Sequence, residues 1–301
     1  EKLVTQNSKA EAVPELCESY DVSDDATTII FHLRKGVKFH DGSEMTADDV
    51  VASMNRWIDG FSSAKSTVGD ARFEKVDDYT VKIAADHSII LLPQMIAGAA
   101  QPAAITTAAA CEKEDSNGFL EEYIGTGPYK FTEWVQDQYI RLDKFDDYTA
   151  YGTEGEAMDG WAGYKAAPTK TLIFNYVPEA TTREAGLETG QYDIIDNVPN
   201  DDVERLTSNP DLHVNSYQAG TVALVFNHKQ GIASNQYFRQ AVNTCLDMDE
   251  ILTAVYGEGG YDLGSCYMDE AQAFWNTDAG SENYNQKDPD KAKKILEENG
   301  Y

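Results

Sequence analysis

The sequence predicts an α/β protein with more than one domain. Its 301 residues correspond to about two domains at roughly 150 residues each. Segments in which apolar and polar residues alternate, as in strands, are interspersed with segments that have helical spacing. The composition, 42% hydrophobic and 11% aromatic, is that of a chain with ordinary folded cores. Interspersed strands and helices predict mixed α/β architecture.

The first ninety residues carry both patterns. Residues 27–34 alternate as a half-buried strand does, and residues 79–83 repeat the pattern. Between them, Thr46 and Asp49 have the spacing of a capping box. Val50, Met54 and Trp57 then fall on one helical face. This region is therefore predicted to contain a strand, a helix and a second strand.

The remaining elements follow from the same two periodicities. A turn at 125–130 leads into a predicted hairpin that ends near 142, and residues 256–275 are predicted to form a long loop. Further strands are expected at 170–177, 192–195, 212–218 and 221–227. Helices are expected at 181–190 with a threonine cap, 201–206, 235–245, 247–255 and 288–296.

The charge of the chain excludes several classes of partner. Asp and Glu number 52 against 24 Lys and Arg, so the net charge is −28. A surface this negative repels nucleic acid and anionic membranes, which basic residues would have to neutralise. No stretch reaches the roughly 18 apolar residues of a membrane helix, and the first residues lack a signal-peptide pattern. We expect a soluble chain that either is cytoplasmic or has lost a signal.

No motif for catalysis or for a metal is present in the sequence. The five histidines are scattered singly, and Pro128 removes an amide that a phosphate loop at 125–130 would need. The four cysteines lack zinc-site spacing and are expected to be free thiols, with one disulfide as the alternative. Acidic clusters could include a glycosidase pair, but 52 acidic residues place neighbours together by chance, and solvated turns and caps explain most of the clusters. No cofactor and no metal are expected.

Several segments, in this order, resemble the solute-binding proteins of peptide-type ABC importers, family 5. The resemblance covers nearly the whole chain, and its strongest part lies between Pro14 and Val50, with the sequence FHLRKGVKFHDG at 31–42. The other matching segments are Gly125–Lys130 with Trp134, Arg183–Leu187, Phe226–Asn227, Arg239–Asn243 and Asp288–Tyr301. Cys17 and Cys245 depart from the small residue that the family usually carries at these positions.

The resemblance implies an α/β fold of the periplasmic-binding-protein-like type II, multi-lobed, with mixed sheets and helices, and truncated at both ends. It implies three regions: an accessory α/β domain at 1–122, part of a first ligand-binding lobe at 123–220, and the first half of a second lobe at 221–301. It also implies a non-catalytic, monomeric protein that captures short peptides between two lobes and delivers them to an ABC permease. Its location would be extracytoplasmic, either as a cell-surface lipoprotein or free in the periplasm.

The ligand contacts expected from this reading lie at the crossover between the lobes and in the long loop. They are Tyr217, Gln218, Gly220, Thr221, Tyr267, Phe274 and Trp275. Tyrosine offers a large apolar face and one polar tip, which suits a pocket for a small polar ligand. Ordinary strand or loop packing explains each residue equally well. Three alternatives stay open: a binding protein for nickel chelates or sugars, an acidic extracellular hydrolase, and a scaffold that binds nothing.

Overall fold

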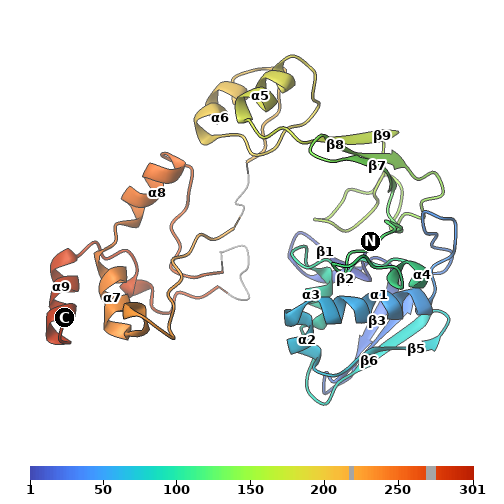
Figure 1. The fold of residues 1–301 in the computed structure, drawn as a ribbon, viewed down its shortest axis with the longest axis horizontal. Helices are drawn as coiled ribbons and strands as arrows, with labels where there is room; N and C mark the ends of the chain where they lie inside the picture. Colours follow the sequence, from blue (N-terminus) through green and yellow to red (C-terminus); the bar gives the residue numbers. More distant parts are fainter. Residues whose placement is uncertain (217–219, 269–275) are drawn as a thin grey trace. The chain divides into compact units, whose positions relative to one another are not determined.

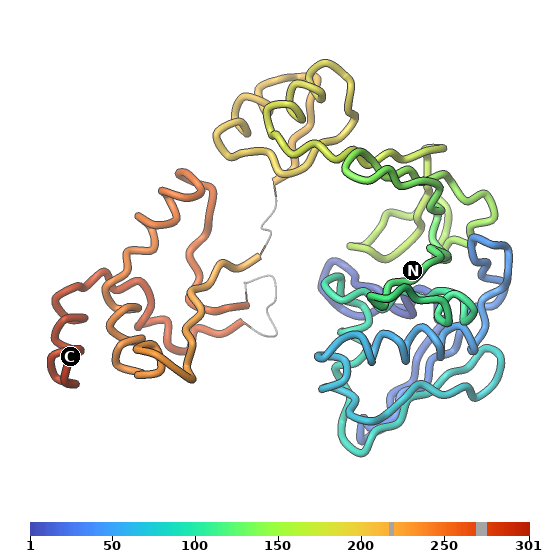
Figure 2. Tube along the Cα trace, viewed as in Figure 1, coloured from blue at the N-terminus to red at the C-terminus, as the bar shows by residue number. Residues whose placement is uncertain are grey.

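The computed structural model describes residues 1–216, 220–268 and 276–301. The chain divides into two compact units, Glu1–Tyr176 and Val177–Tyr301. This division does not test the three regions implied by the resemblance, which stay a prediction. Figure 2 follows the course of the backbone through both units.

The first unit is built on three antiparallel sheets. The largest has the strand order β3-β4-β6-β5, the smallest pairs β1 with β2, and the third has the order β7-β8-β9. Helix α1 lies along the largest sheet (Figure 1). The strands are β1 (Val4–Gln6), β2 (Ala12–Pro14), β3 (Cys17–Val22), β4 (Thr28–Leu33), β5 (Phe73–Asp77), β6 (Thr80–Ala84), β7 (Tyr129–Val135), β8 (Tyr139–Lys144) and β9 (Thr171–Asn175). The helices are α1 (Ala47–Gly60), α2 (Ser62–Val68), α3 (Leu92–Ala97) and α4 (Ala108–Cys111).

The start of α1 confirms the predicted cap. Asp49 Oδ2 accepts a hydrogen bond from the backbone N–H of Thr46 at 2.9 Å, which satisfies a donor that the helix itself cannot satisfy. The other carboxylate oxygen of Asp49 accepts from the N–H of Ala108 at 2.9 Å. One side chain therefore both begins α1 and holds α4 beside it.

The core of the first unit lies between the largest sheet and α1. Phe31, at the centre of β4, is fully buried, and its ring lies 5.7 Å from that of Tyr20 and 6.1 Å from that of Phe73. Val50, Met54 and Trp57 are buried on the α1 face that the sequence predicts. Burial of this continuous apolar cluster is the main stabilisation of the unit.

The second unit is mainly helical and buries far less apolar surface. Its described helices are α5 (Ala180–Glu188), α6 (Asn200–Thr207), η1 (Ile232–Ser234), α7 (Gln236–Cys245), α8 (Met248–Tyr256), η3 (Ser281–Asn283) and α9 (Pro289–Glu298). Among its described residues, the buried hydrophobic side chains are Leu206, Ala241 and Ala292. The packing of α7 against α9 contributes two of these three side chains.

Most predicted elements are confirmed, but three strand predictions and one cap are wrong. Residues 192–195, 212–216 and 221–227 form no strand in the part of the chain that the structure describes. Their alternation is that of strands, but a strand also needs a neighbour to complete its backbone hydrogen bonds. The residue that precedes α5 is Glu179, and no side chain caps that helix, so the threonine cap is also wrong.

Candidate ligand-binding region

The crossover residues that the structure describes lie in an irregular, exposed segment of the second unit. Gly220 has φ +142°, a backbone conformation that glycine adopts readily and other residues rarely do. Thr221 is exposed, and neither residue belongs to a helix or strand. The predicted contacts Tyr217, Gln218, Phe274 and Trp275 lie outside the described residues.

Tyr267, from the long loop, is 68% exposed. Two side chains bind backbone carbonyls of the described part of this loop. Asn200 donates a hydrogen bond to the carbonyl of Tyr256 at 2.6 Å, and Asn276 donates to the carbonyl of Met268 at 2.6 Å. A third contact, from the hydroxyl of Tyr261 to the carbonyl of Asp249 at 3.1 Å, ties the loop to α8. The loop thus presents Tyr267 to solvent from an anchored backbone.

A network centred on Arg205 joins α5 and α6, the two helices that precede the crossover in the sequence. Arg205 contacts Glu184, Glu188 and Asp202 at 2.5, 2.5 and 3.1 Å. Glu184 is buried, and its second oxygen has no hydrogen-bond partner among the described residues. Sequence reasoning missed this network, because Arg205 and Glu184 are 21 residues apart and neither residue forms a motif with its neighbours.

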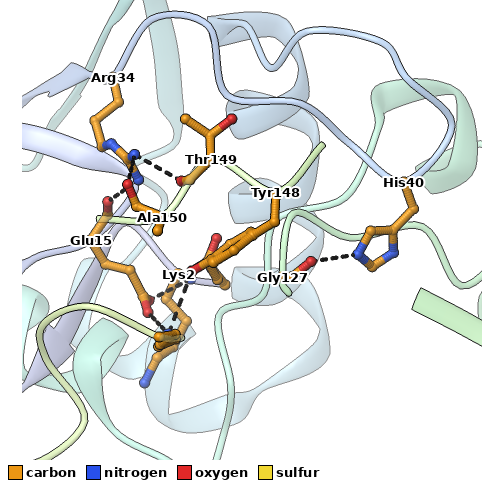
Figure 3. A network of polar contacts seen from close by, with 10 residues as sticks. Lys2, Glu15, Arg34, His40, Gly127, Tyr148, Thr149 and Ala150 are labelled. Atoms are coloured by element: carbon orange, nitrogen blue, oxygen red, sulfur yellow. Dashed lines mark hydrogen bonds and ion pairs between the residues drawn. The ribbon is translucent and has the colours of Figure 1, made fainter. Parts of the chain in front are cut away.

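A second network is buried in the first unit and holds the 148–165 loop against the N-terminal strands (Figure 3). Lys165 contacts Glu15, whose other oxygen accepts from the backbone N–H of Lys2 at 2.9 Å. Tyr148 donates its hydroxyl to Glu1 at 2.7 Å. Burial by itself would lower the pKa of Lys165. The nearby Glu15 and Glu1 carboxylates outweigh burial and hold this pKa above its ordinary value. Burial, followed by the Glu1 charge, raises the pKa of Tyr148.

Arg34 completes this second network. Its guanidinium donates to the carbonyls of Glu15, Thr149 and Ala150 at 3.1, 2.9 and 2.9 Å. Five fixed N–H donors let one arginine satisfy several carbonyls at once. All of these partners belong to the chain itself, so the contacts of Arg34 fix the 148–165 loop.

His40 connects two turns of the first unit, as Figure 3 also shows. Its Nδ1 accepts from the N–H of Gly125 at 3.2 Å, and its Nε2 lies 3.0 Å from the carbonyl oxygen of Gly127. Accepting at one nitrogen while donating at the other requires the neutral ring. Burial lowers the pKa of His40 and outweighs the opposing hydrogen bond to Gly127.

We therefore expect His40 to make the stability of the first unit dependent on pH. A histidine with a lowered folded-state pKa contributes stability that is complete above its unfolded pKa of about 6.5 and is lost as pH falls toward the folded pKa. The free energy of unfolding should fall between pH 7.5 and pH 5.5, and His40→Gln should reduce this fall. His32→Gln, an exposed position, is the control. An equal fall in the wild type and in His40→Gln would contradict the prediction.

The β7-β8-β9 sheet has one apolar and one polar face. Trp134, Ile140 and Phe174 form a row across the three strands, and all three are exposed. A hollow of about 280 Å³ is lined by Tyr123, Phe131, Trp134 and Ile140. The opposite face carries ion-paired residues such as Arg141 and Asp143, which lie 3.0 Å apart.

One pair of neighbouring carboxylates lacks the raised pKa that the acid of a glycosidase needs. Asp247 and Asp249 both contact Lys287, at 3.1 and 2.5 Å. The N–H of Glu250 and then Lys287 lower the pKa of Asp247, and Lys287 lowers that of Asp249. A catalytic general acid requires the opposite shift. This pair therefore stabilises a loop and does not favour the hydrolase alternative.

No group of three or more metal-ligating side chains occurs in the described part of the chain. The structure pairs none of the four cysteines, all of which are described. Burial raises the pKa of the Cys17 thiol to about 12, so this thiol is a poor nucleophile at neutral pH. Among the described residues, no helix is both long and apolar enough to cross a membrane.

Comparison with known proteins identifies the family. Residues 11–301 match the family model described as bacterial extracellular solute-binding proteins, family 5, middle part. The chain belongs to this family. The match covers the segments from 14 to 301 that carry the resemblance in the sequence, which confirms that prediction.

Two curated members of the family show how the chain relates to longer proteins. It is 31% identical to heme-binding protein A of Haemophilus influenzae over 318 residues, which cover 96% of this chain and 54% of that protein. It is 30% identical to the oligopeptide-binding protein AppA of Bacillus subtilis, covering 100% of this chain and 52% of that protein. The chain thus spans about half the length of these relatives.

Solved structures confirm the fold class predicted from the sequence. The PBP AgaA from A. tumefacien R10, solved in complex with agropinic acid, is 29% identical to this chain in sequence and superimposes with a TM-score of 0.72. The match covers 100% of this chain and 58% of that chain. The dipeptide-binding protein from Pseudoalteromonas sp. SM9913, in complex with Met-Leu, is 25% identical, with a TM-score of 0.73 over 100% and 60%. The fold is that of the type II periplasmic binding proteins.

Proposed function

We propose that the whole protein is the substrate-binding component of an ABC importer and that its cargo is a short peptide. The observation that carries this proposal is the match of residues 11–301 to the family of extracellular solute-binding proteins. Peptides are favoured because AppA of Bacillus subtilis is an oligopeptide-binding protein and the related protein of Escherichia coli is a dipeptide-binding protein. The heme-binding relative and the agropinic acid complex show that family members also bind other solutes.

The mechanism is binding without chemistry. A peptide that contacts both lobes of the whole protein binds the closed state more tightly than the open state, and so shifts the population toward closure. A permease that recognises the closed form then receives only loaded protein. No step requires a nucleophile, an acid or a metal. Delivery to the permease places the protein outside the cytoplasmic membrane, either free or anchored by lipid.

The cargo is tested by titrating the protein with di-, tri- and tetrapeptides in a calorimeter. We expect heat of binding and a 1:1 endpoint for at least one peptide class, and none for matched concentrations of free amino acids. Nickel–histidine, heme and simple sugars form the comparison set. Binding of one of these, with silence across the peptides, would refute the peptide cargo but keep the solute-binding role. Silence of the whole protein across every class would contradict the solute-binding role.

Tyr267 is the described residue at which a ligand contact can be tested most cleanly. Replacing Tyr267 with alanine should weaken peptide binding about tenfold, because an aromatic contact with a ligand is worth roughly 1–2 kcal/mol. The loop is anchored through the Tyr256 and Met268 carbonyls, so the substitution should leave the fold intact. Tyr176→Ala, at a similarly exposed tyrosine (63%), is the matched control. Equal peptide affinities for the two variants would exclude Tyr267 from the site.

A further inference from the structure

Two Asn-Gly pairs occur in the sequence, at Asn117–Gly118 and Asn299–Gly300. Such a pair is prone to deamidation, because glycine has no β-carbon to hinder the attack of its backbone nitrogen on the asparagine side chain. The backbone conformation decides how often this attack occurs, since the nitrogen must reach the side-chain carbonyl carbon. The structure holds the first pair in a turn of the first unit.

This turn, residues 114–120, is named the Asn117 turn, and its two ends form an antiparallel bridge. The N–H of Gly118 donates to the carbonyl of Asp115 at 3.0 Å. Gly118 has φ +79°, which glycine adopts without strain. The Asp115 carboxylate accepts from the N–H of Asn117 at 2.8 Å and from that of Phe119 at 2.9 Å. The nitrogen that would attack is therefore already hydrogen-bonded and is fixed by the turn.

Arg56, on α1, holds the Asn117 turn closed. Its Nη2 donates to the carbonyl of Gly118 at 2.7 Å, and its Nε contacts the Glu114 carboxylate. Hydrogen bonds from a charged guanidinium are stronger than those between neutral groups. All of these partners lie in the first unit, so contacts within that unit set how often the turn opens.

We propose that Asn117 is a deamidation site whose rate is set by the opening of the Asn117 turn. In the open turn, hydroxide removes the proton from the backbone nitrogen of Gly118, and this nitrogen forms a bond to Cγ of Asn117. The bond from Cγ to the side-chain nitrogen breaks, and ammonia leaves with a proton taken from water. Water then opens the resulting cyclic imide, at Cγ to give aspartate or at the backbone carbonyl carbon to give isoaspartate.

Either product weakens the closed turn. A carboxylate at position 117 is separated by one residue from the Asp115 carboxylate, and like charges repel each other. Isoaspartate also adds one methylene group to the backbone, which shifts the Gly118 nitrogen away from the carbonyl of Asp115. The reaction therefore proceeds from a closed turn to one that closes less well on Arg56.

Mass spectrometry of peptides from the protein, incubated at about pH 8 and 37 °C, measures conversion at both Asn-Gly pairs. A synthetic peptide of residues 112–121, which lacks Arg56, gives the unprotected rate. We expect conversion at Asn117 to be slower in the protein than in this peptide by about tenfold or more. Arg56→Gln should raise the rate at Asn117 about threefold or more and leave the rate at Asn299 unchanged.

Arg72→Gln is the matched control. Arg72 and Arg56 have side chains that are each 36% exposed, and Arg72 pairs with a carboxylate of α1, that of Asp59, at 2.8 Å. Its substitution removes a similar ion pair from the same helix and should leave the rate at Asn117 unchanged. Equal acceleration by Arg72→Gln and Arg56→Gln would overturn the proposal.

Hydrogen exchange provides a second readout. The amide of Gly118 exchanges only when its hydrogen bond to Asp115 opens. Arg56→Gln should therefore speed this exchange and the deamidation of Asn117 by the same factor. Faster deamidation with unchanged exchange would overturn the proposal. Equal rates in protein and peptide would also overturn it, as would no conversion in Arg56→Gln while the peptide converts fully.

Discussion

Replacing Phe31 with alanine is expected to lower the free energy of unfolding of the Glu1–Tyr176 unit by about 3–5 kcal/mol. Phe31 is fully buried on β4, with neighbouring strands on both sides and the rings of Tyr20 and Phe73 against it. Truncation removes apolar burial and leaves a cavity that these neighbours can fill only in part. Urea unfolding followed by fluorescence measures the loss, since Trp57 is buried in the same core.

Phe119→Ala is the control for this measurement. Phe119 belongs to the same unit but is exposed, so its truncation should change the free energy of unfolding by less than about 0.5 kcal/mol. Similar losses for both variants would contradict the core assigned to the largest sheet and α1.

Replacing Glu15 with glutamine should destabilise the first unit by about 3 kcal/mol. Removing one partner of a buried ion pair typically costs about 3–5 kcal/mol, because the other charge stays buried without compensation. We expect the low end of this range, because the Lys165 side chain is 27% exposed and still has the Glu1 carboxylate as an ion-pair partner, with 3.5 Å between Nζ and Oε1. Urea unfolding measures this loss as well, with the slope of the transition expected to be unchanged.

Two further variants separate the charge effect from packing. Lys165→Met in the Glu15→Gln background should restore part of the lost stability, because it removes the cation that has lost Glu15 and keeps an apolar side chain of similar length. The recovery is partial because Glu1 also loses Lys165 and keeps only the Tyr148 hydroxyl. Glu122→Gln breaks the exposed pair with Lys113 and should cost less than about 1 kcal/mol. A double variant as unstable as Glu15→Gln would refute an electrostatic role for the pair.

Local patterns predicted the elements whose stabilising contacts lie close in the sequence. The cap at Thr46 and Asp49 depends on neighbours three residues apart, and the structure confirms it. The alternation at 27–34 is also confirmed, because β4 finds neighbours in β3 and β6. The same alternation at 221–227 did not predict the outcome, because a strand needs a partner far away in the sequence. Of the predicted ligand contacts, Gly220, Thr221 and Tyr267 are described and exposed, and their role stays a prediction.

The sequence alone determined the family, the acidic character of the surface and the order of most helices and strands. These depend on motifs, composition and short-range periodicity, which the linear chain contains in full. The tertiary structure decided which strands pair, which carboxylates are buried and which apolar segments stay exposed. Glu15 meets Lys165 across 150 residues, and His40 meets Gly127 across 87. No local pattern specifies such contacts, because their free energy arises only when folding brings distant groups together.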